Sequence, residues 1–202
     1  MLDGVMRGVI DPGLTRWGLR LAQRGWTADA MTALGLAFGV ATALILALGL
    51  PSWLALVPLL AGRLADGLDG AIARAQGKTD FGGFADILAD FVFYGAVPLA
   101  FALRDPELAQ AAAFLLFSFY VNGAGFLAFA TMAAKRGMET RAQGEKSLYF
   151  SAGLLEGTET ILLFVALCLW PGAFQPLAWA FGALCLVTTG VRVLLARRVF
   201  GQ

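Results

Sequence analysis

The stretches R-L-A-D-G-L-D-G-A-I-A-R (residues 63–74) and G-G-F-A-D-I-L-A-D (residues 82–90) place four aspartates in apolar sequence. They are Asp66, Asp69, Asp86 and Asp90. A carboxylate at bilayer depth costs about 2.5–3.5 kcal/mol on insertion scales, and four together repel one another unless a cation is bound or a proton is taken up. Oxygen ligands suit Mg²⁺, Mn²⁺ or Ca²⁺, whereas Zn²⁺ favours His and Cys, and the chain has no His. The pattern therefore predicts a site for hard divalent cations.

The spacing of the aspartates predicts two helices, each with an acidic face, because the members of the two pairs are three and four residues apart. The face of Asp66 continues through Gly70, Ala73 and Arg74. Small residues let a ligand or a second backbone come close, and a guanidinium matches the geometry of phosphate. Acids, small residues and one Arg together favour a metal-bound diphosphate. Topology alone is the alternative explanation of Arg74, and structural ion pairs or helix caps are the alternative for the aspartates.

Composition indicates a membrane protein, since 59% of the 202 residues are hydrophobic and the mean hydropathy is +0.74. The net charge of +1 suggests no nucleic-acid partner. We expect an all-α fold with six transmembrane helices, at roughly 30–50, 53–75, 83–103, 108–134, 147–170 and 174–196. Short connections predict one domain over 1–202, in which 28–202 form the bundle and 1–27 a juxtamembrane helix.

That N-terminal segment is expected to be an amphipathic helix lying on the inner leaflet, with a plain cytoplasmic tail as the alternative. Its apolar and basic positions fall on separate faces, with Leu14, Trp17 and Leu21 on one and Arg16, Arg20 and Arg24 on the other. In the predicted topology, most Lys and Arg lie on the side of the membrane that holds the N-terminus, and the loops on the other side hold only Arg104. This bias predicts cytoplasmic N- and C-termini and an active site near the cytoplasmic face of a bacterial-type inner membrane.

The pattern D-x2-D-G-x2-A-R-x7-G-x3-D-x3-D over residues 66–90 closely resembles the signature of the CDP-alcohol phosphotransferase family, with eight fixed positions within 25 residues. One interval differs, because seven residues separate Arg74 from Gly82 where the common pattern has eight. Members exchange the CMP of a CDP-linked alcohol for a second alcohol in phospholipid synthesis. The resemblance therefore implies an enzyme.

The resemblance also implies roles for individual residues. Two divalent ions, Mg²⁺ or Mn²⁺, would be bound, one by Asp66, Asp69 and Asp86 and the other by Asp66, Asp86 and Asp90. Asp90 would also be the general base on the incoming hydroxyl. Contacts to the CDP-linked donor are expected from Asp66, Gly67, Asp69, Gly70, Ala73, Arg74, Gly82 and Thr32.

The segment T-A-D-A-M-T (residues 27–32) opens the first predicted span, where family members often show T-P-N-x-x-T. The sequence keeps Thr27 and Thr32, so Thr32 either lies near the nucleotide or is structural. Asp29 is expected to be the N-cap of this span, since Asp is among the favoured N-cap residues.

Two further groups of residues concern the acceptor. A basic inner loop containing Arg136 and Arg141 suits an anionic acceptor or lipid, although topology alone also explains it. Glu156 and Glu159 share a helical face within a predicted span, where acids are functional by default. They would bind the hydroxyls or ammonium of an acceptor, or pair with Arg192 or Arg63. The second group leads us to favour a polyol or amino acceptor.

The expected reaction is transfer of a phosphatidyl group from CDP-diacylglycerol to a hydroxyl acceptor, with release of CMP. One alternative is an aminoalcohol phosphotransferase that uses CDP-choline or CDP-ethanolamine with diacylglycerol. An alternative of another class is a carboxylate-lined cation transporter. The resemblance is compatible with a homodimer, for which Gly123 and Gly125 offer small contact residues.

Overall fold

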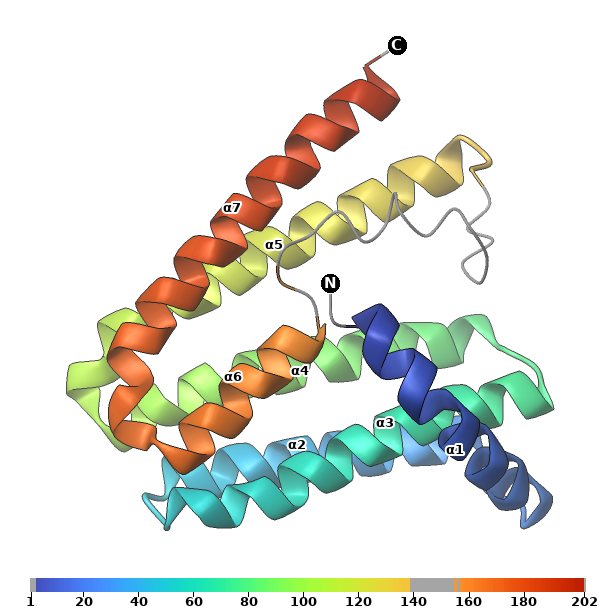
Figure 1. Ribbon diagram of the computed structural model, residues 1–202, viewed down its shortest axis with the longest axis horizontal. Coiled ribbons are helices and arrows are strands. Elements are labelled where there is room, and N and C mark those ends of the chain that lie inside the picture. Colours follow the sequence, from blue (N-terminus) through green and yellow to red (C-terminus); the bar gives the residue numbers. More distant parts are fainter. Residues whose placement is uncertain (1–2, 139–154, 156, 202) are drawn as a thin grey trace.

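The computed structural model describes residues 3–138, 155 and 157–201, with side chains from residue 10 onward, and all regular structure in these ranges is helical (Figure 1). The α-helices are α1 (Asp3–Gln23), α2 (Ala28–Ala47), α3 (Leu56–Gln76), α4 (Asp80–Arg104), α5 (Ala109–Lys135), α6 (Gly157–Leu169) and α7 (Phe174–Phe200). Short 3₁₀ helices η1 (Ser52–Ala55), η2 (Pro106–Leu108) and η4 (Pro171–Ala173) precede α3, α5 and α7. The predicted spans match these helices, although the beginning of 147–170 lies outside the described residues.

Within the described ranges, four helical segments are long and apolar enough to cross a membrane, which makes the chain a multi-pass membrane protein. They are Ala28–Ala47, Asp80–Arg104, Pro106–Lys135 and Pro171–Phe200. Helix α3 has 21 residues but carries the charged motif, and α6 has 13 residues as described. A total of six spans therefore stays a prediction.

Helix α2 is the centre of one half of the bundle, because both α3 and α4 pack on it. Glycines allow these close approaches. A Cβ atom on Gly62 of α3 would lie 3.2 Å from the carbonyl oxygen of Gly35 on α2, and one on Gly39 would lie 2.9 Å from the Phe93 ring on α4. The three helices are thereby held close enough for side chains of α2, α3 and α4 to meet.

Replacing Gly62 by Val should lower the melting temperature of the detergent-solubilised protein, because the added methyl groups must enter the backbone of α2. Overpacking of this kind costs about 1–3 kcal/mol. Gly190→Val on α7 is the matched control, since a Cβ there meets nothing within 4 Å. Thermal unfolding followed by fluorescence tests the difference, and equal melting temperatures for the two variants would contradict the close packing of α2 and α3.

The main hydrophobic core lies at one end of the bundle, where α5, α6 and α7 meet α2, α3 and α4. Phe101 and Phe174 stack there with ring centroids 4.2 Å apart, and Phe93 meets Phe164 edge-on at 5.4 Å. From this end α5 and α7 diverge from α2, α3 and α4, as Figure 1 shows. At the other end of the bundle, where α3 ends and α4 begins, the described residues form a small core cluster of Met31, Ala65 and Ile72.

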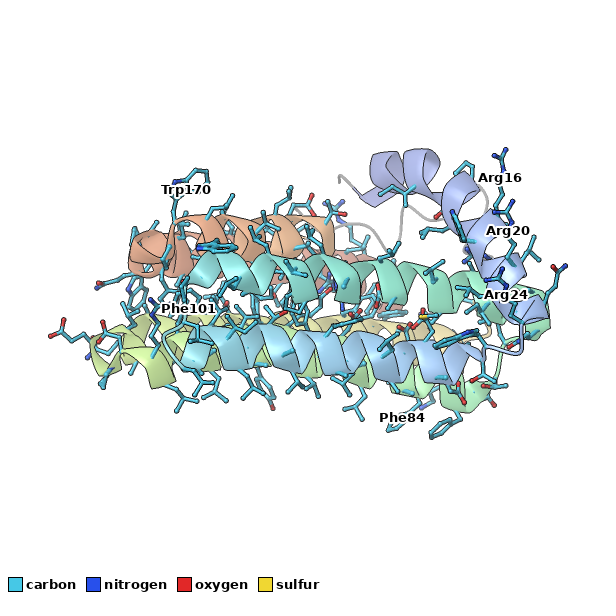
Figure 2. The ribbon with its side chains drawn as sticks, turned by 90° about the horizontal axis from the view of Figure 1, so that it is seen from below. Arg16, Arg20, Arg24, Phe84, Phe101 and Trp170 are labelled. Atoms are coloured by element: carbon cyan, nitrogen blue, oxygen red, sulfur yellow. The ribbon has the colours of Figure 1, made fainter. Side chains whose placement is uncertain are left out.

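The N-terminal helix α1 packs against α3, as Gly18 and Leu14 show by facing Ala71 and Gly67. Arg16 and Arg20 of this helix and Arg24 just after it are exposed, and they lie at the end of the bundle opposite Phe101 and Trp170 (Figure 2). The helix ends at Gln23, four residues before the predicted boundary. Trp17 is 58% exposed and lines an apolar cavity of about 380 Å³ between α1 and α3. A helix is thus present where one was expected, and its position on the inner leaflet stays a prediction.

Candidate active site

The turn between α3 and α4 brings the two halves of the acidic motif together. Helix α3 ends at Gln76, and the next residue, Gly77, has a φ of +103° that is readily adopted only by glycine. Thr79 then caps α4 and accepts a hydrogen bond from the backbone N–H of Gly82. Helix α4 begins at Asp80, three residues before the predicted span 83–103, so Gly82 lies in its first turn. The turn occupies the interval in which the sequence is one residue shorter than the common pattern.

Three of the four aspartates form one cluster. Asp66, Asp69 and Asp86 each offer a carboxylate oxygen, and these atoms lie within 4.8 Å of one another. Asp69 is buried and accepts a hydrogen bond of 2.6 Å from the hydroxyl of Thr32, while the other two carboxylates are half-buried. Among the described residues, no Lys or Arg lies within ion-pair distance of Asp69 or Asp86. The three carboxylates offer hard oxygen ligands that lie close together with little positive charge nearby, and such a group fits a divalent cation.

The fourth carboxylate, Asp90, is held by an arginine instead. Nη1 of Arg63 lies 3.0 Å from Oδ1 of Asp90 and donates a hydrogen bond to it. The same nitrogen lies 3.5 Å from Oδ1 of Asp66. Arg63 therefore bridges the cluster and Asp90. From the sequence, Arg63 was expected only as a partner of acids, and its specific pairing with Asp90 was not predicted.

The remaining donor-contact candidates take up different surroundings. A Cβ on Gly70 would lie 3.5 Å from Nη1 of Arg74, which confirms that these two residues share a face of α3. Gly67 instead faces Leu14 of α1, so it serves helix packing in this structure. Ala73 lies half-buried near the end of α3. Their contacts with a nucleotide stay predictions.

The expected cap at Asp29 is wrong. Thr27 is the N-cap of α2 and accepts a hydrogen bond from the N–H of Ala30, which leaves Asp29 in the first turn. The Asp29 carboxylate lies beside the start of α4, where a Cβ on Gly82 would be 3.2 Å from its Oδ1. A negative charge is favourable at both helix N-termini.

The acceptor candidates are only partly described, because Arg141 and Glu156 lie outside the described residues. Arg136 donates hydrogen bonds of 3.0 and 2.8 Å to the carbonyl oxygens of Val199 and Phe200, and its guanidinium lies over the Phe200 ring. It thereby caps the end of α7. Glu159 is half-buried in the first turn of α6, where an acid also suits the helix dipole.

One polar cluster between α5 and α7 was missed by the sequence analysis. Nη1 of Arg192 lies 2.9 Å from Oδ1 and 3.0 Å from the backbone oxygen of Asn122, and Thr189 lies 3.4 Å from the same Oδ1. Gly123, which follows Asn122, faces the ring of Phe91, and Phe91 follows Asp90 in the sequence. The cluster therefore lies at the same height along the bundle as Asp90. The available signal was a lone Asn in an apolar span. Gly123 and Gly125 face Phe91 and Thr189 within the chain, so they give no support to a homodimer, which stays a prediction.

Comparison with known proteins agrees with this geometry. Residues 26–191 match the sequence model of the CDP-alcohol phosphatidyltransferase family. The inner membrane protein YnjF of Escherichia coli K12 is 49% identical over 196 residues, which cover 96% of this chain and 94% of the relative. The crystal structure of Mycobacterium tuberculosis phosphatidylinositol phosphate synthase (PgsA1) with CDP-DAG bound superposes with a TM-score of 0.71 at 24% identity, covering 91% of this chain and 93% of that one. This second likeness shows a shared fold.

Proposed function

The chain belongs to the CDP-alcohol phosphatidyltransferase family, and on that basis we propose that it transfers a phosphatidyl group from CDP-diacylglycerol to a hydroxyl acceptor and releases CMP. The observation that carries the proposal is the meeting of three carboxylates from α3 and α4 with Asp90 beside them. The choice of donor is supported by the structurally similar synthase, which binds CDP-DAG.

Asp66, Asp69 and Asp86 would hold one divalent ion, and Asp66, Asp86 and Asp90 would contact the second. When bound, such ions neutralise a diphosphate and the charge that develops on it during displacement at phosphorus. Arg74 would add a fixed positive charge to the donor's diphosphate from the face that it shares with Gly70. Thr32 would act indirectly, since its hydroxyl fixes the buried carboxylate of Asp69.

Asp90 would take the proton of the acceptor hydroxyl. The acceptor oxygen then forms a bond to the phosphorus of the phosphatidyl group while the bond from that phosphorus to the bridging diphosphate oxygen breaks. CMP leaves with the electron pair of that bond, and the proton stays on the carboxylate of Asp90. Arg63 would position Asp90 before the donor binds, because in the free chain it holds Oδ1 at 3.0 Å.

The family assignment favours this reaction over a cation transporter, because it accounts for the glycines, Ala73 and Arg74 that accompany the acids. The aminoalcohol phosphotransferase differs in its substrates rather than its site. Purified protein should be given CDP-diacylglycerol or CDP-choline with diacylglycerol, each with a panel of hydroxyl acceptors, and the lipids analysed by mass spectrometry. We expect a new phospholipid only from CDP-diacylglycerol. Product from CDP-choline alone would overturn the choice of donor.

Glu159→Gln should raise the acceptor KM by about 10-fold or more while leaving the donor KM unchanged, because a charge-assisted hydrogen bond contributes about 1.5–3 kcal/mol. The prediction applies to a polyol or amino acceptor bound by the face of α6. Arg136→Gln should leave the acceptor KM unchanged, since Arg136 is engaged with the end of α7. Steady-state kinetics with the acceptor found by lipid analysis provide the test. A lower melting temperature with an unchanged KM in Glu159→Gln would show that this face is structural.

A further inference from the structure

We propose that Arg63 keeps Asp90 out of the metal site until the donor binds, so that the free enzyme takes up one divalent ion and the donor-bound enzyme two. This inference rests on the proposed function. Its starting point is one nitrogen, Nη1 of Arg63, which lies 3.0 Å from Asp90 and 3.5 Å from Asp66. These are two of the carboxylates that a second ion would have to share.

The guanidinium of Arg63 lies beside Asp66 and Asp90, so it competes with a second metal cation for the same two carboxylates. Two cations that contact the same carboxylates repel each other strongly in a partly desolvated site. A second ion bound by Asp66 and Asp90 must therefore displace Arg63 or accept a weakened pair of ligands. The geometry gives Arg63 the role of an internal cation that partly neutralises these two acids.

Arg63 is also fixed in place, which makes its displacement unfavourable. Its side chain is only 18% exposed, and its guanidinium lies 4.7 Å from the centroid of the Phe93 ring. That ring is buried and packs against Gly39 of α2. Within the described part of the chain, Nε of Arg63 is buried without a hydrogen-bond partner, so the ion pairs through Nη1 are its polar anchor.

The first ion does not depend on Arg63 in the same way. Asp69 is positioned by Thr32 from α2, and its carboxylate lies with that of Asp86 in the cluster. Only Asp66 belongs both to this cluster and to the Arg63 contacts. The structure thus has three acids grouped closely enough to bind one ion, and a fourth acid, Asp90, that is paired with Arg63.

The bound donor would change this balance, because a diphosphate brings negative charge to the site. That charge attracts a second cation and offsets the loss of the Arg63 ion pairs. Uptake of the second ion then becomes coupled to donor binding, and by reciprocity the second ion strengthens donor binding. Arg63 is a positioning residue in this scheme, since it acts through Asp90 rather than on the substrate.

The test is electron paramagnetic resonance of Mn²⁺ titrated into purified protein in detergent, with and without CDP-diacylglycerol. Two Mn²⁺ ions that share carboxylates couple magnetically, whereas one bound ion does not. We expect an uncoupled ion in the wild type alone and a coupled pair once CDP-diacylglycerol is added. Arg63→Gln, and Arg63→Met, which keeps apolar packing on Phe93, should show the coupled pair without donor and bind the second ion at least about tenfold more tightly.

Arg104→Gln is the matched control, because Arg104 bonds Ser52 at the other end of α4 and should leave the titration unchanged. The inference is overturned by a coupled pair in the wild type without donor, by a single ion in the donor-bound wild type, or by Arg63 variants that fold and still take up one ion. If neither Arg63 variant folds, the wild type with and without donor decides. Absence of any Mn²⁺ binding by the wild type would instead contradict the metal site of the proposed function.

Discussion

Replacing Asp90 by Asn is expected to lower turnover at least about 100-fold, because it removes the group that accepts the acceptor's proton while keeping its size and shape. Asp90 is suited to this role by its surroundings. It lies outside the cluster of the other three aspartates, and Arg63 holds its Oδ1 in place before the donor binds. Donor affinity should fall less than turnover, since three carboxylates remain for the first ion. Steady-state kinetics and donor binding by the same preparation measure both quantities.

Asp80→Asn is the matched control, because it makes the same chemical change on an exposed residue in the first turn of α4. It should retain nearly full turnover. If Asp90→Asn instead loses donor affinity while its residual turnover stays normal, Asp90 is only a ligand and its role as the base is wrong.

Removal of divalent metal is expected to abolish activity, and Mg²⁺ or Mn²⁺ should restore it. The reason is electrostatic, since carboxylates whose oxygens lie within 4.8 Å of one another cannot receive a diphosphate without added positive charge. Asp66→Asn, Asp69→Asn and Asp86→Asn should each raise the Mn²⁺ concentration needed for half-maximal activity about tenfold or more, because each removes one charged ligand. Activity measured across a metal titration after EDTA treatment and dialysis gives these values.

The three substitutions should differ in their effect on the fold. Asp69 is the most buried of the cluster and is bonded to Thr32, so Asp69→Asn keeps the hydrogen bond but removes charge from an apolar site. Melting temperatures without metal should therefore rise or stay unchanged in this variant, while those of the wild type should rise when Mn²⁺ is added. Full activity in excess EDTA would contradict the metal site directly.

Most of the helical framework could be predicted from the sequence, because long apolar runs are a local signal. The predicted segment 83–103 corresponds to α4 (Asp80–Arg104), and 174–196 corresponds to α7 (Phe174–Phe200). The cap of α2 could not be distinguished in this way. Thr27 and Asp29 both suit an N-cap, and only the backbone shows that the helix begins at Ala28.

The acids of the site could also be predicted, since their spacing follows the helical repeat. Their division could not be predicted from the spacing alone, although the resemblance implied that Asp66, Asp69 and Asp86 bind one ion. Which three of four carboxylates meet depends on how α3 and α4 pack on α2. Gly35 and Gly39 have the G-x-x-x-G spacing typical of close helix contacts, but this spacing does not say that the partners are Gly62 on α3 and Phe93 on α4. For the same reason Arg63 could be recognised as a cation near acids, but not as the specific partner of Asp90.

Contacts between distant helices were the hardest to foresee. The pairing of Asn122 with Arg192 joins residues that are 70 positions apart, and Thr32 reaches Asp69 across 37 positions. Arg136 belongs to a basic loop that suggested an anionic acceptor or lipid, yet in the fold it caps α7 by donating hydrogen bonds to backbone carbonyls. Such uses of polar side chains are decided by tertiary structure rather than by local sequence.

The most direct test of the central claim is the release of labelled CMP from CDP-diacylglycerol by the purified protein in detergent. We predict release that requires Mg²⁺ or Mn²⁺ and a hydroxyl acceptor, with one phospholipid formed for each CMP, and its loss in Asp66→Asn but not in Asp80→Asn. No release of CMP from CDP-diacylglycerol with any acceptor in the presence of metal, from protein that is folded and binds Mn²⁺, would contradict the account.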